Sequence, residues 1–289
     1  MDIANLETFI AVAELGSFSL ASERLYLTQP AISKRIAALE AELDTRLFDR
    51  IGRRVDLTEA GSALLPRVRS ILQAVEDTRC AIANLAGKIS GRLGVGTSHH
   101  IGLHRLPPIL RAYSRQYPDV ELNLNFMDSE AACRAVEHGE LELGIVTLPL
   151  TASEALRARP VWPDPLDIVV GKTHPLSGRK RITPHALGEH AAILPARGTY
   201  TREIFERTFT PLGVSLRVSM TTNYLETIKM MVVVGLGWSV LPRTMLSPDL
   251  EVLRVPTIKL ERTLGVVWHA GRTLSNSAVA MLDALTSGT

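Results

Sequence analysis

Residues 28–43 carry the pattern of one amphipathic helix with a clearly marked start, and this stretch constrains the fold more than any other. Thr28 is a residue type that caps helices through its hydroxyl, and Pro30 falls in the first turn, where a missing amide hydrogen costs nothing. Apolar residues then recur at helical spacing, at Ile32, Ile36, Leu39 and Leu43. The helix therefore has one face for a core, and its polar amino end remains available for another task.

The residues before this helix predict two further helices, over 3–15 and 17–25, with Gly16 as a natural helix end between them. Two short helices, a tight turn and a third helix with a polar amino end are the layout of a helix-turn-helix, whose third helix enters the major groove of DNA. A solvated surface helix is the alternative for residues 28–43 alone, and the neighbouring helices favour DNA. The candidate DNA-binding residues on this helix are Thr28, Gln29, Pro30, Ser33 and Lys34.

Residues 46–58 form the most strongly basic stretch and predict two short strands joined through Gly52, hence a wing beside the helix-turn-helix. The formal net charge of the chain is only +2, so contact with DNA requires a local patch of this kind. We expect Arg50, Arg53 and Arg54 to reach phosphates or the minor groove, against the alternative of a solvated charged surface.

Residues 58–88 predict one long helix in which apolar residues recur about every 3.5 residues. This repeat is typical of a seam between two helices, and a core helix of a larger domain is the alternative. A seam makes a homodimer with two reading heads, which helix-turn-helix proteins use for two half-sites. The predicted seam consists of Leu64, Val68, Ile71, Val75, Ile82 and Leu85.

Beyond a glycine-containing break at residues 87–91, strands alternate with helices, which predicts a parallel α/β architecture in two units. We therefore expect two lobes with a cleft between them. The predicted organisation is a winged helix-turn-helix domain over 1–57, a linker and dimerisation helix over 58–88, and a regulatory domain over 89–289. In that domain, lobe I covers 90–161 and 268–289, and lobe II covers 162–267.

Hydroxyl-rich loops mark the predicted cleft. Ligands of two-lobed α/β domains bind where strand ends and helix amino termini meet, and the loops at 97–100, 128–129 and 198–202 have that place. Hydroxyls and free amides at helix starts suit a carboxylate, sulfate or phosphate, and a simple helix cap is the alternative for each residue taken singly. The candidate ligand-binding residues in these loops are Thr97, Ser98, His99, His100, Ser129, Gly198, Thr199, Tyr200 and Thr201.

Histidines 99, 100 and 104 raise the question of a metal site. We expect none, because no cysteine is near and adjacent histidines on a loop tend to point apart. Cys80 and Cys133 lie far apart without a CxxC pair, which disfavours zinc binding and disulfides and is typical of a reduced cytoplasmic protein. Neither a metal nor a cofactor is therefore expected, beyond a small-molecule effector.

Motifs of common enzyme classes are missing from the sequence. It contains no GxSxG, no P-loop GKS/T, no HExxH and no dinucleotide GxGxxG after a strand, so a binding protein is favoured over an enzyme. The longest apolar run, residues 230–241, is broken by glycines and too short to span a bilayer, and the amino terminus lacks the pattern of a signal peptide. We expect a cytoplasmic protein that associates with the nucleoid and not with membranes.

Several short blocks, in order and spacing, resemble the LysR-type transcriptional regulators of bacteria. They are Phe9, Gly16-Ser17-Phe18, Gln29-Pro30-Ala31-Ile32-Ser33, Leu39-Glu40, Leu47-Phe48-Asp49-Arg50 and Leu57-Thr58-Glu59-Ala60-Gly61, with weaker matches at 139–145 and 235–242. The resemblance implies a winged helix-turn-helix, a dimerising linker helix and a periplasmic-binding-protein-like domain that senses a small molecule. A ligand-independent architectural DNA-binding protein and an α/β enzyme are the alternatives.

The resemblance also implies site residues and partners. Thr147, Asn223 and Tyr224 are expected to line the effector cleft, and the chain is expected to form a homotetramer on DNA with RNA polymerase as a partner. Lys34 stands where the family usually has arginine, and lysine lacks the bidentate fork, so we expect a phosphate contact there. Effector binding is then expected to change the DNA bend through the geometry of the oligomer.

Overall fold

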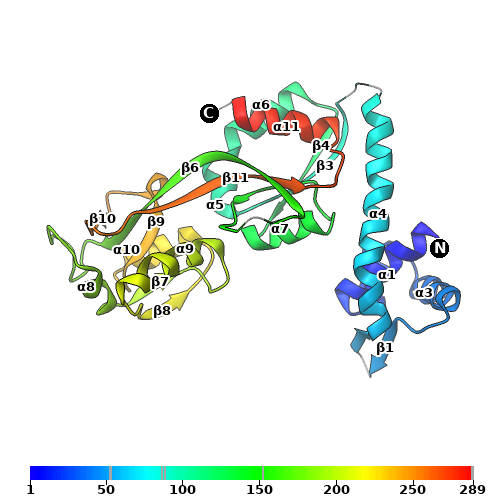
Figure 1. Cartoon of the computed structure of the whole chain (residues 1–289), viewed down its shortest axis with the longest axis horizontal. Coiled ribbons are helices and arrows are strands. Elements are labelled where there is room, and N and C mark those ends of the chain that lie inside the picture. Colours follow the sequence, from blue (N-terminus) through cyan, green and yellow to red (C-terminus); the bar gives the residue numbers. More distant parts are fainter. Residues whose placement is uncertain (52–53, 86, 88, 152, 288–289) are drawn as a thin grey trace. The chain divides into compact units, whose positions relative to one another are not determined.

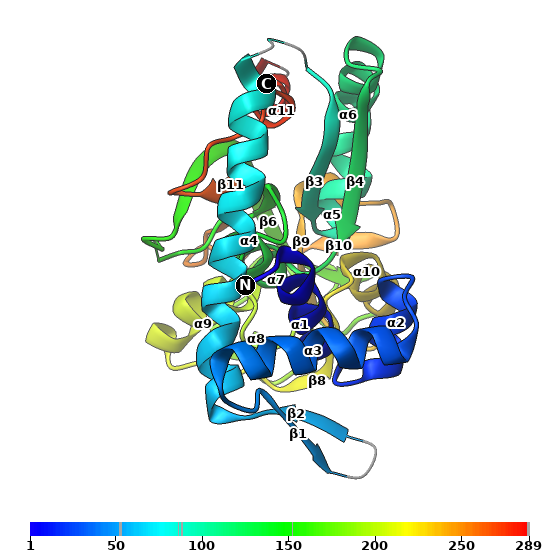
Figure 2. The ribbon, with the colours of Figure 1, turned by 90° about the vertical axis from the view of Figure 1, so that its right-hand side faces the viewer.

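The computed structural model describes residues 1–51, 54–85, 87, 89–151 and 153–287. The chain divides into two compact units, Met1–Ala86 and Gly87–Thr289 (Figures 1 and 2). Each unit has its own hydrophobic core, and each is described by itself. Among the helices of the described residues, none combines the length and the apolar character needed to cross a bilayer.

The first unit is a winged helix-turn-helix with a long helix. Its elements are α1 (Ile3–Leu15), α2 (Phe18–Arg24), α3 (Gln29–Leu43), β1 (Phe48–Ile51), β2 (Arg54–Leu57) and α4 (Glu59–Leu85). Gly16 ends α1 in the left-handed conformation at φ +57°, and the side chain of Ser17 then caps α2. Thr28 occupies the N-cap position of α3, but within the described residues its hydroxyl accepts no capping hydrogen bond, contrary to expectation.

Aromatic residues join the helices of this unit to the wing. Phe48 of β1 packs 5.3 Å from the ring of Phe9 and 6.0 Å from that of Phe18, measured between centroids. From α3, Ile32 and Ile36 are buried in the same core, as their spacing predicted. The β1–β2 hairpin projects beyond α3 in Figure 2. The residues at the amino end of α3, Thr28 to Pro30, are exposed and so lie away from this core.

The 27-residue helix α4 serves two environments, which corrects the predicted seam. Val68 is fully buried in the winged-domain core and Leu64 is partly buried against it, so neither lies on a free helix face. Ile71 and Ile82 are exposed, at 36% and 65%. A 3.5-residue repeat for a seam and a 3.6-residue repeat for a core face cannot be distinguished over so few turns. The predicted seam therefore included residues of the core face as well as residues of the free face.

Val75 and Leu85 are the two remaining residues of the predicted seam. Val75 is partly exposed, as a residue of a free face should be. The side chain of Leu85 lies outside the described residues, so its predicted place in the seam stays a prediction.

The second unit is built on a mixed sheet with the order β10-β6-β11-β5-β3-β4, and β9 also pairs with β6. Its strands are β3 (Gly91–Thr97), β4 (Val120–Phe126), β5 (Leu143–Thr147), β6 (Leu156–Gly171), β9 (Ser239–Pro242), β10 (Leu250–Val252) and β11 (Leu260–His269), and a separate parallel pair is formed by β7 (Ala192–Leu194) and β8 (Val218–Thr221). Parallel pairing holds for β3 with β4 and β5, whereas β6 and β11 run antiparallel to all their partners.

The helices gather into two lobes. Lobe I holds α5 (His99–His104), α6 (Leu106–Gln116), α7 (Ser129–Glu137) and α11 (Asn276–Ser287), and lobe II holds α8 (Pro184–Gly188), α9 (Tyr200–Phe209), α10 (Leu225–Val233) and the short 3₁₀ turns η1 (Thr210–Leu212) and η2 (Arg243–Met245). The long strands β6 and β11 run from one lobe to the other (Figure 1).

The crossings between the lobes differ from the predicted boundaries. Trp162 of β6 packs in the core of lobe I and Leu166 in that of lobe II. On β11, Leu260 belongs to lobe II, but Leu264 and Val266 are buried in lobe I. The second crossing therefore falls before residue 264 and not at 267–268. One continuous strand serves both cores, and its apolar alternation carries no mark where it passes between them.

Close packing at the start of α4 makes the winged domain sensitive to substitution of Gly61. An added Cβ there presses against the carbonyl oxygen of Leu47 and the side chain of Leu57. We expect Gly61→Ala to lower the free energy of unfolding of this domain by about 1–3 kcal/mol, as overpacking does. Ser62→Ala, at the exposed next position, should change it by less than about 0.5 kcal/mol. Equal stabilities of the two variants in urea unfolding would contradict this packing.

Candidate functional site

The amino end of α3 presents the predicted polar surface. Thr28, Gln29, Pro30 and Lys34 are exposed, and Ser33 is partly exposed. Since these side chains lie on one end of a helix whose other face is buried, they are accessible to a groove of DNA. Of the predicted wing residues, Arg53 lies outside the described residues, and so do the side chains of Arg50 and Arg54. The contacts of all eight residues with DNA stay predictions.

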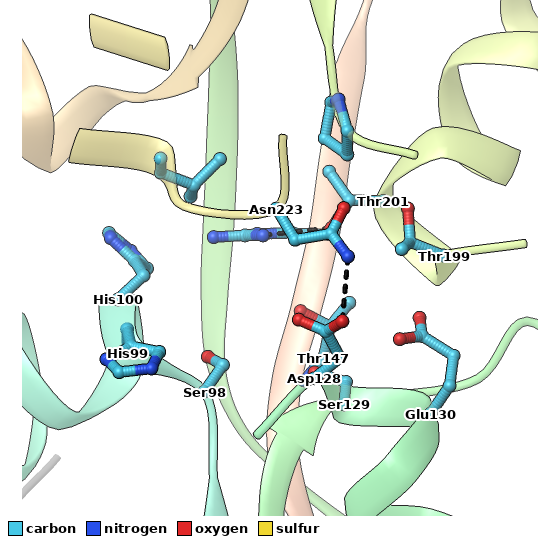
Figure 3. A pocket seen from close by; sticks show the side chains of 13 residues that line it. Ser98, His99, His100, Asp128, Ser129, Glu130, Thr147, Thr199, Thr201 and Asn223 are labelled. Carbon is cyan, nitrogen blue, oxygen red and sulfur yellow. Dashed lines mark hydrogen bonds between the residues drawn. The ribbon is translucent and has the colours of Figure 1, made fainter. Parts of the chain in front are cut away.

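A small cavity lies between the two lobes of the second unit (Figure 3). Its volume is about 50 Å³, which suits a small molecule or ion. The predicted residues that line it are Ser98, His99, His100, Ser129, Thr147, Thr199, Thr201 and Asn223. The loops after three strands thus meet at one place, although they are far apart in the sequence.

The structure also adds residues to the cavity. Asp128, Glu130, Pro195, Leu225 and Arg262 line it and were not among the candidates. Asp128 belongs to a loop that the sequence had marked, and Glu130 lies in the first turn of the helix after it. A signal for Arg262 does exist in the sequence: it alternates in phase with Leu260 and Leu264, which places a charged residue on the buried face of a strand.

Four predicted residues are not found among those that line the cavity in the described structure. Thr97 is fully buried and its hydroxyl donates to the carbonyl of Ile145 at 2.9 Å, so it holds strands together. Gly198 is exposed at φ +85° and makes the turn before α9. Residues 200 and 224 also fall outside: Tyr200 packs partly buried against the α7 core, and Tyr224 is 55% exposed.

Arg262 is the most unusual group in the cavity because it is charged and buried. Its Nε donates to Oδ2 of Asp164 at 2.7 Å, and its Nη1 donates to the hydroxyl of Thr201 at 3.0 Å. Its Nη2 is buried and has no hydrogen-bond partner among the described residues. Arg105 binds the other oxygen of Asp164 at 3.4 Å. Two guanidinium groups therefore share one carboxylate, which leaves an excess positive charge beside the cavity.

Two carboxylates, those of Asp128 and Glu130, also line the cavity. The side-chain amide of Asn223, in lobe II, donates to Asp128 of lobe I at 2.7 Å (Figure 3, dashed line), and Asn223 itself accepts from the backbone of Ala196 at 2.9 Å. Glu130 accepts a hydrogen bond from the backbone N–H of Tyr200. Burial raises the pKa of Glu130, and the bond from Tyr200 offsets part of this effect. Both acids thus also connect the lobes.

The hydroxyls of the cavity have local partners as well. Ser98 caps α5 by accepting from Ile101, and Thr199 caps α9 by accepting from Arg202 at 3.2 Å. Ser129 accepts from the backbone of Thr147 at 3.0 Å. The helix-cap alternative considered for the sequence is therefore correct for Ser98 and Thr199, and both side chains also face the cavity.

The neighbouring histidines point in different directions, as expected for adjacent residues on a loop. The ring of His99 stacks on Phe126 at 5.3 Å, whereas the ring of His100 lies 4.9 Å from that of His104. Burial and the nearby charge of Arg262 lower the pKa of His100 to about 3, so its imidazole is neutral at physiological pH. His104 Nε2 lies 3.0 Å from Oε1 of Glu226 on α10.

The fold and the two sites define a DNA-binding transcriptional regulator with a separate ligand-binding domain. Residues 3–62 match the family model described as a bacterial regulatory helix-turn-helix protein of the lysR family, and residues 86–289 match the LysR substrate binding domain. The chain belongs to the LysR family of bacterial transcriptional regulators. The predicted class of fold, a winged helix-turn-helix followed by a long helix and an α/β domain, is confirmed.

Known proteins show the same arrangement. The chain is 34% identical over 287 residues to the regulator CbbR of Rhodospirillum rubrum, covering 97% of this chain and 94% of CbbR. Its structure resembles that of full-length CbnR in complex with target DNA, at TM-score 0.66 and 22% identity over the whole of both chains. It also resembles the regulatory domain of Synechocystis CcmR in complex with 2-PG, at TM-score 0.63 and 28% identity, covering 69% of this chain and 98% of that domain.

The surface of α3 yields a prediction about DNA affinity. Lys34→Ala should weaken binding to all sequences alike and reduce the slope of log K against log salt by about one, because lysine neutralises one phosphate. Gln29→Ala should leave that slope unchanged and cost about 1–3 kcal/mol of discrimination between operator and unrelated DNA. Fluorescence anisotropy at several salt concentrations measures both. Lys180→Ala, at an exposed lysine of the second unit, is the control.

The raised pKa of Glu130 yields a prediction about pH. Because the folded-state pKa lies above the unfolded value of about 4.5, the native state binds more protons in the range above 4.5, and stability falls as pH rises through it. Glu130→Gln removes this loss. We expect the variant to unfold at a higher temperature than the wild type at pH 8, with a gap that shrinks toward pH 4.5. Glu154→Gln, at an exposed carboxylate, is the control, and a gap independent of pH would refute the assignment.

Proposed function

We propose that the cavity between the lobes binds a small anion that also carries hydrogen-bond donors, and that its occupancy changes how this regulator binds or bends DNA. The observation that carries the proposal is the buried Nη2 of Arg262, which has no hydrogen-bond partner among the described residues. An unpaired donor on a buried charge is costly, and an anionic oxygen in the cavity removes that cost.

The charges around the cavity support an anion with donors over a plain anion. Arg262 and Arg105 outnumber Asp164 by one positive charge, which favours a carboxylate, sulfate or phosphate group at that end. Asp128 and Glu130 also line the cavity, accept hydrogen bonds, and suit a hydroxyl or amine of the ligand. The cavity volume of about 50 Å³ suits a small ligand. The complex of the CcmR regulatory domain with 2-PG, a relative of the same fold, supports a small-molecule effector.

Coupling to DNA follows from the position of the cavity. The bond between Asn223 and Asp128 joins the two lobes, so a ligand that binds one lobe arrangement better shifts the population toward it. We propose that the exposed face of α4, with Ile71 and Ile82, forms the dimer seam and that dimers pair into a tetramer. The lobe shift then alters the spacing of the DNA-reading heads and the access of RNA polymerase to the promoter.

We further propose that the protein is a sensor without catalytic activity and acts in the cytoplasm, at the nucleoid. The hydroxyls that face the cavity support this, since Ser98, Ser129 and Thr199 each accept a backbone hydrogen bond in a capping or bridging role. A nucleophilic hydroxyl donates its hydrogen bond to a general base, whereas the hydroxyl of Thr199 donates to the backbone carbonyl of Ala196 at 2.9 Å.

Thermal unfolding of the full chain against sulfate, phosphate, hydroxy acids and phosphate esters tests the proposal. A ligand at about 100 times its dissociation constant stabilises the folded state by about 2.7 kcal/mol. We expect one chemical class to raise the melting temperature, and Arg262→Gln to abolish that shift. Thr201→Val removes only the hydroxyl beside Arg262 and should reduce the shift in melting temperature. This second variant tests the proposal even if loss of the buried charge prevents Arg262→Gln from folding.

Arg243→Gln is a matched control, because Arg243 makes a bidentate pair with Asp167 on the surface at 3.0 and 3.2 Å. It should keep the full ligand-induced shift. If Arg262→Gln and Thr201→Val both kept the same ligand-induced shift in melting temperature as the wild type, the ligand would bind elsewhere. A shift without any change in DNA bend angle or footprint would separate ligand binding from regulation and reject the second half of the proposal.

A further inference from the structure

Three side chains with metal-ligating atoms meet beside the cavity. His100 and His104 stand four residues apart and lie on the same face of α5, and Glu226 lies in the first turn of α10. One nitrogen from each histidine and one oxygen of Glu226 all lie within 4.8 Å of one another. This is the one such trio of histidine, cysteine or acidic residues in the described part of the chain.

His100 needs an explanation of its own. Only 4% of the residue is exposed, and both of its ring nitrogens are buried without a hydrogen-bond partner among the described residues. Buried polar atoms in native proteins are nearly always satisfied, because each one left alone forfeits its hydration. An imidazole whose nitrogens have no proton donor or acceptor to bind keeps a lone pair available for a cation.

We propose that His100, His104 and Glu226 bind a divalent transition-metal ion of the zinc class, which ties α5 of lobe I to α10 of lobe II. Two histidines four apart on a helix with one carboxylate from elsewhere form a recurrent three-ligand zinc set, which leaves a fourth position open. Nothing in the proposed anion binding requires this ion.

The distances fit such an ion after a small adjustment. Zinc bonds of about 2.0–2.2 Å in tetrahedral geometry place ligand atoms about 3.3–3.5 Å apart. His104 Nε2 and Glu226 Oε1 already lie at 3.0 Å. The side chains of His104 and Glu226 are 35% and 39% exposed, so they can rotate toward His100, and solvent can deliver the ion.

Nearby charge and the type of ligand atom together favour an ion of the zinc class. Arg262 and Arg105 lie near His100 and repel cations, and Asp164 neutralises only one of them. Hard ions such as Mg²⁺ are held mainly by charge and prefer oxygen ligands, so this site disfavours them. Zn²⁺, Co²⁺ and Ni²⁺ gain more from imidazole ligands. His99 takes no part, because its ring stacks on Phe126 and contacts Tyr224.

Calorimetric titration of the full chain with Zn²⁺ tests the site. We expect one ion per chain in the wild type, at least about tenfold weaker binding in His104→Gln and in Glu226→Gln, and no binding of Mg²⁺. Co²⁺ in place of Zn²⁺ should give the intense visible absorption of a four-coordinate nitrogen and oxygen site, lost in both variants. Both residues are partly exposed, so neither variant should fail to fold, and circular dichroism verifies this.

The matched control is His138→Gln, because His138 faces Glu140 at 3.8 Å as a pair of one histidine and one carboxylate. It should bind Zn²⁺ as the wild type does. Equal affinities of the wild type, His104→Gln and Glu226→Gln would overturn the proposal, and so would tight binding of Mg²⁺. Because the measurement follows metal and not anion, its failure would leave the anion proposal intact, and the reverse also holds.

Discussion

The regulatory domain depends on one buried charge pair where two long strands cross between its lobes. Asp164 of β6 and Arg262 of β11 are direct partners in the antiparallel register, and their side chains are joined at 2.7 Å. Buried ion pairs add little net stability, but they strongly disfavour any arrangement that separates them. This pair therefore holds the register at the crossing and, through it, places the guanidinium group beside the cavity.

The cavity and the proposed metal site both lie near this crossing of the strands. Asn223 and Asp128 close one side of the cavity between the lobes, and Glu226 approaches His104 on another. Each contact joins a residue of lobe I to one of lobe II, so each is broken or made when the lobes move. The proposed anion at Arg262 and the proposed metal ion at His100 would both act on the contacts between the lobes, and linkage would then make their binding affinities interdependent.

The sequence predicted the parts of the site that depend on local pattern. Hydroxyl residues at strand-to-helix turns, such as Ser98 and Thr199, line the cavity because any helix that starts at a strand end brings its cap there. Arg262 was missed, because its one signal is the phase of a short alternation. Residues 99–104 alone do not indicate the acidic partner of His104, because Glu226 stands 122 residues after it in the chain. Val68 was misassigned because a core face and a dimer seam share nearly the same repeat.

By itself, the amino-acid sequence determined the family, the winged helix-turn-helix, the long helix and the α/β character of the rest, since caps, glycine stops and apolar periods act within a few residues of one another. Only the tertiary structure decided which half of α4 is buried, where the strands cross between the lobes, and which charges meet at the cavity. Those outcomes depend on strand register and lobe packing, which join residues about 100 positions apart and leave no local trace in the chain.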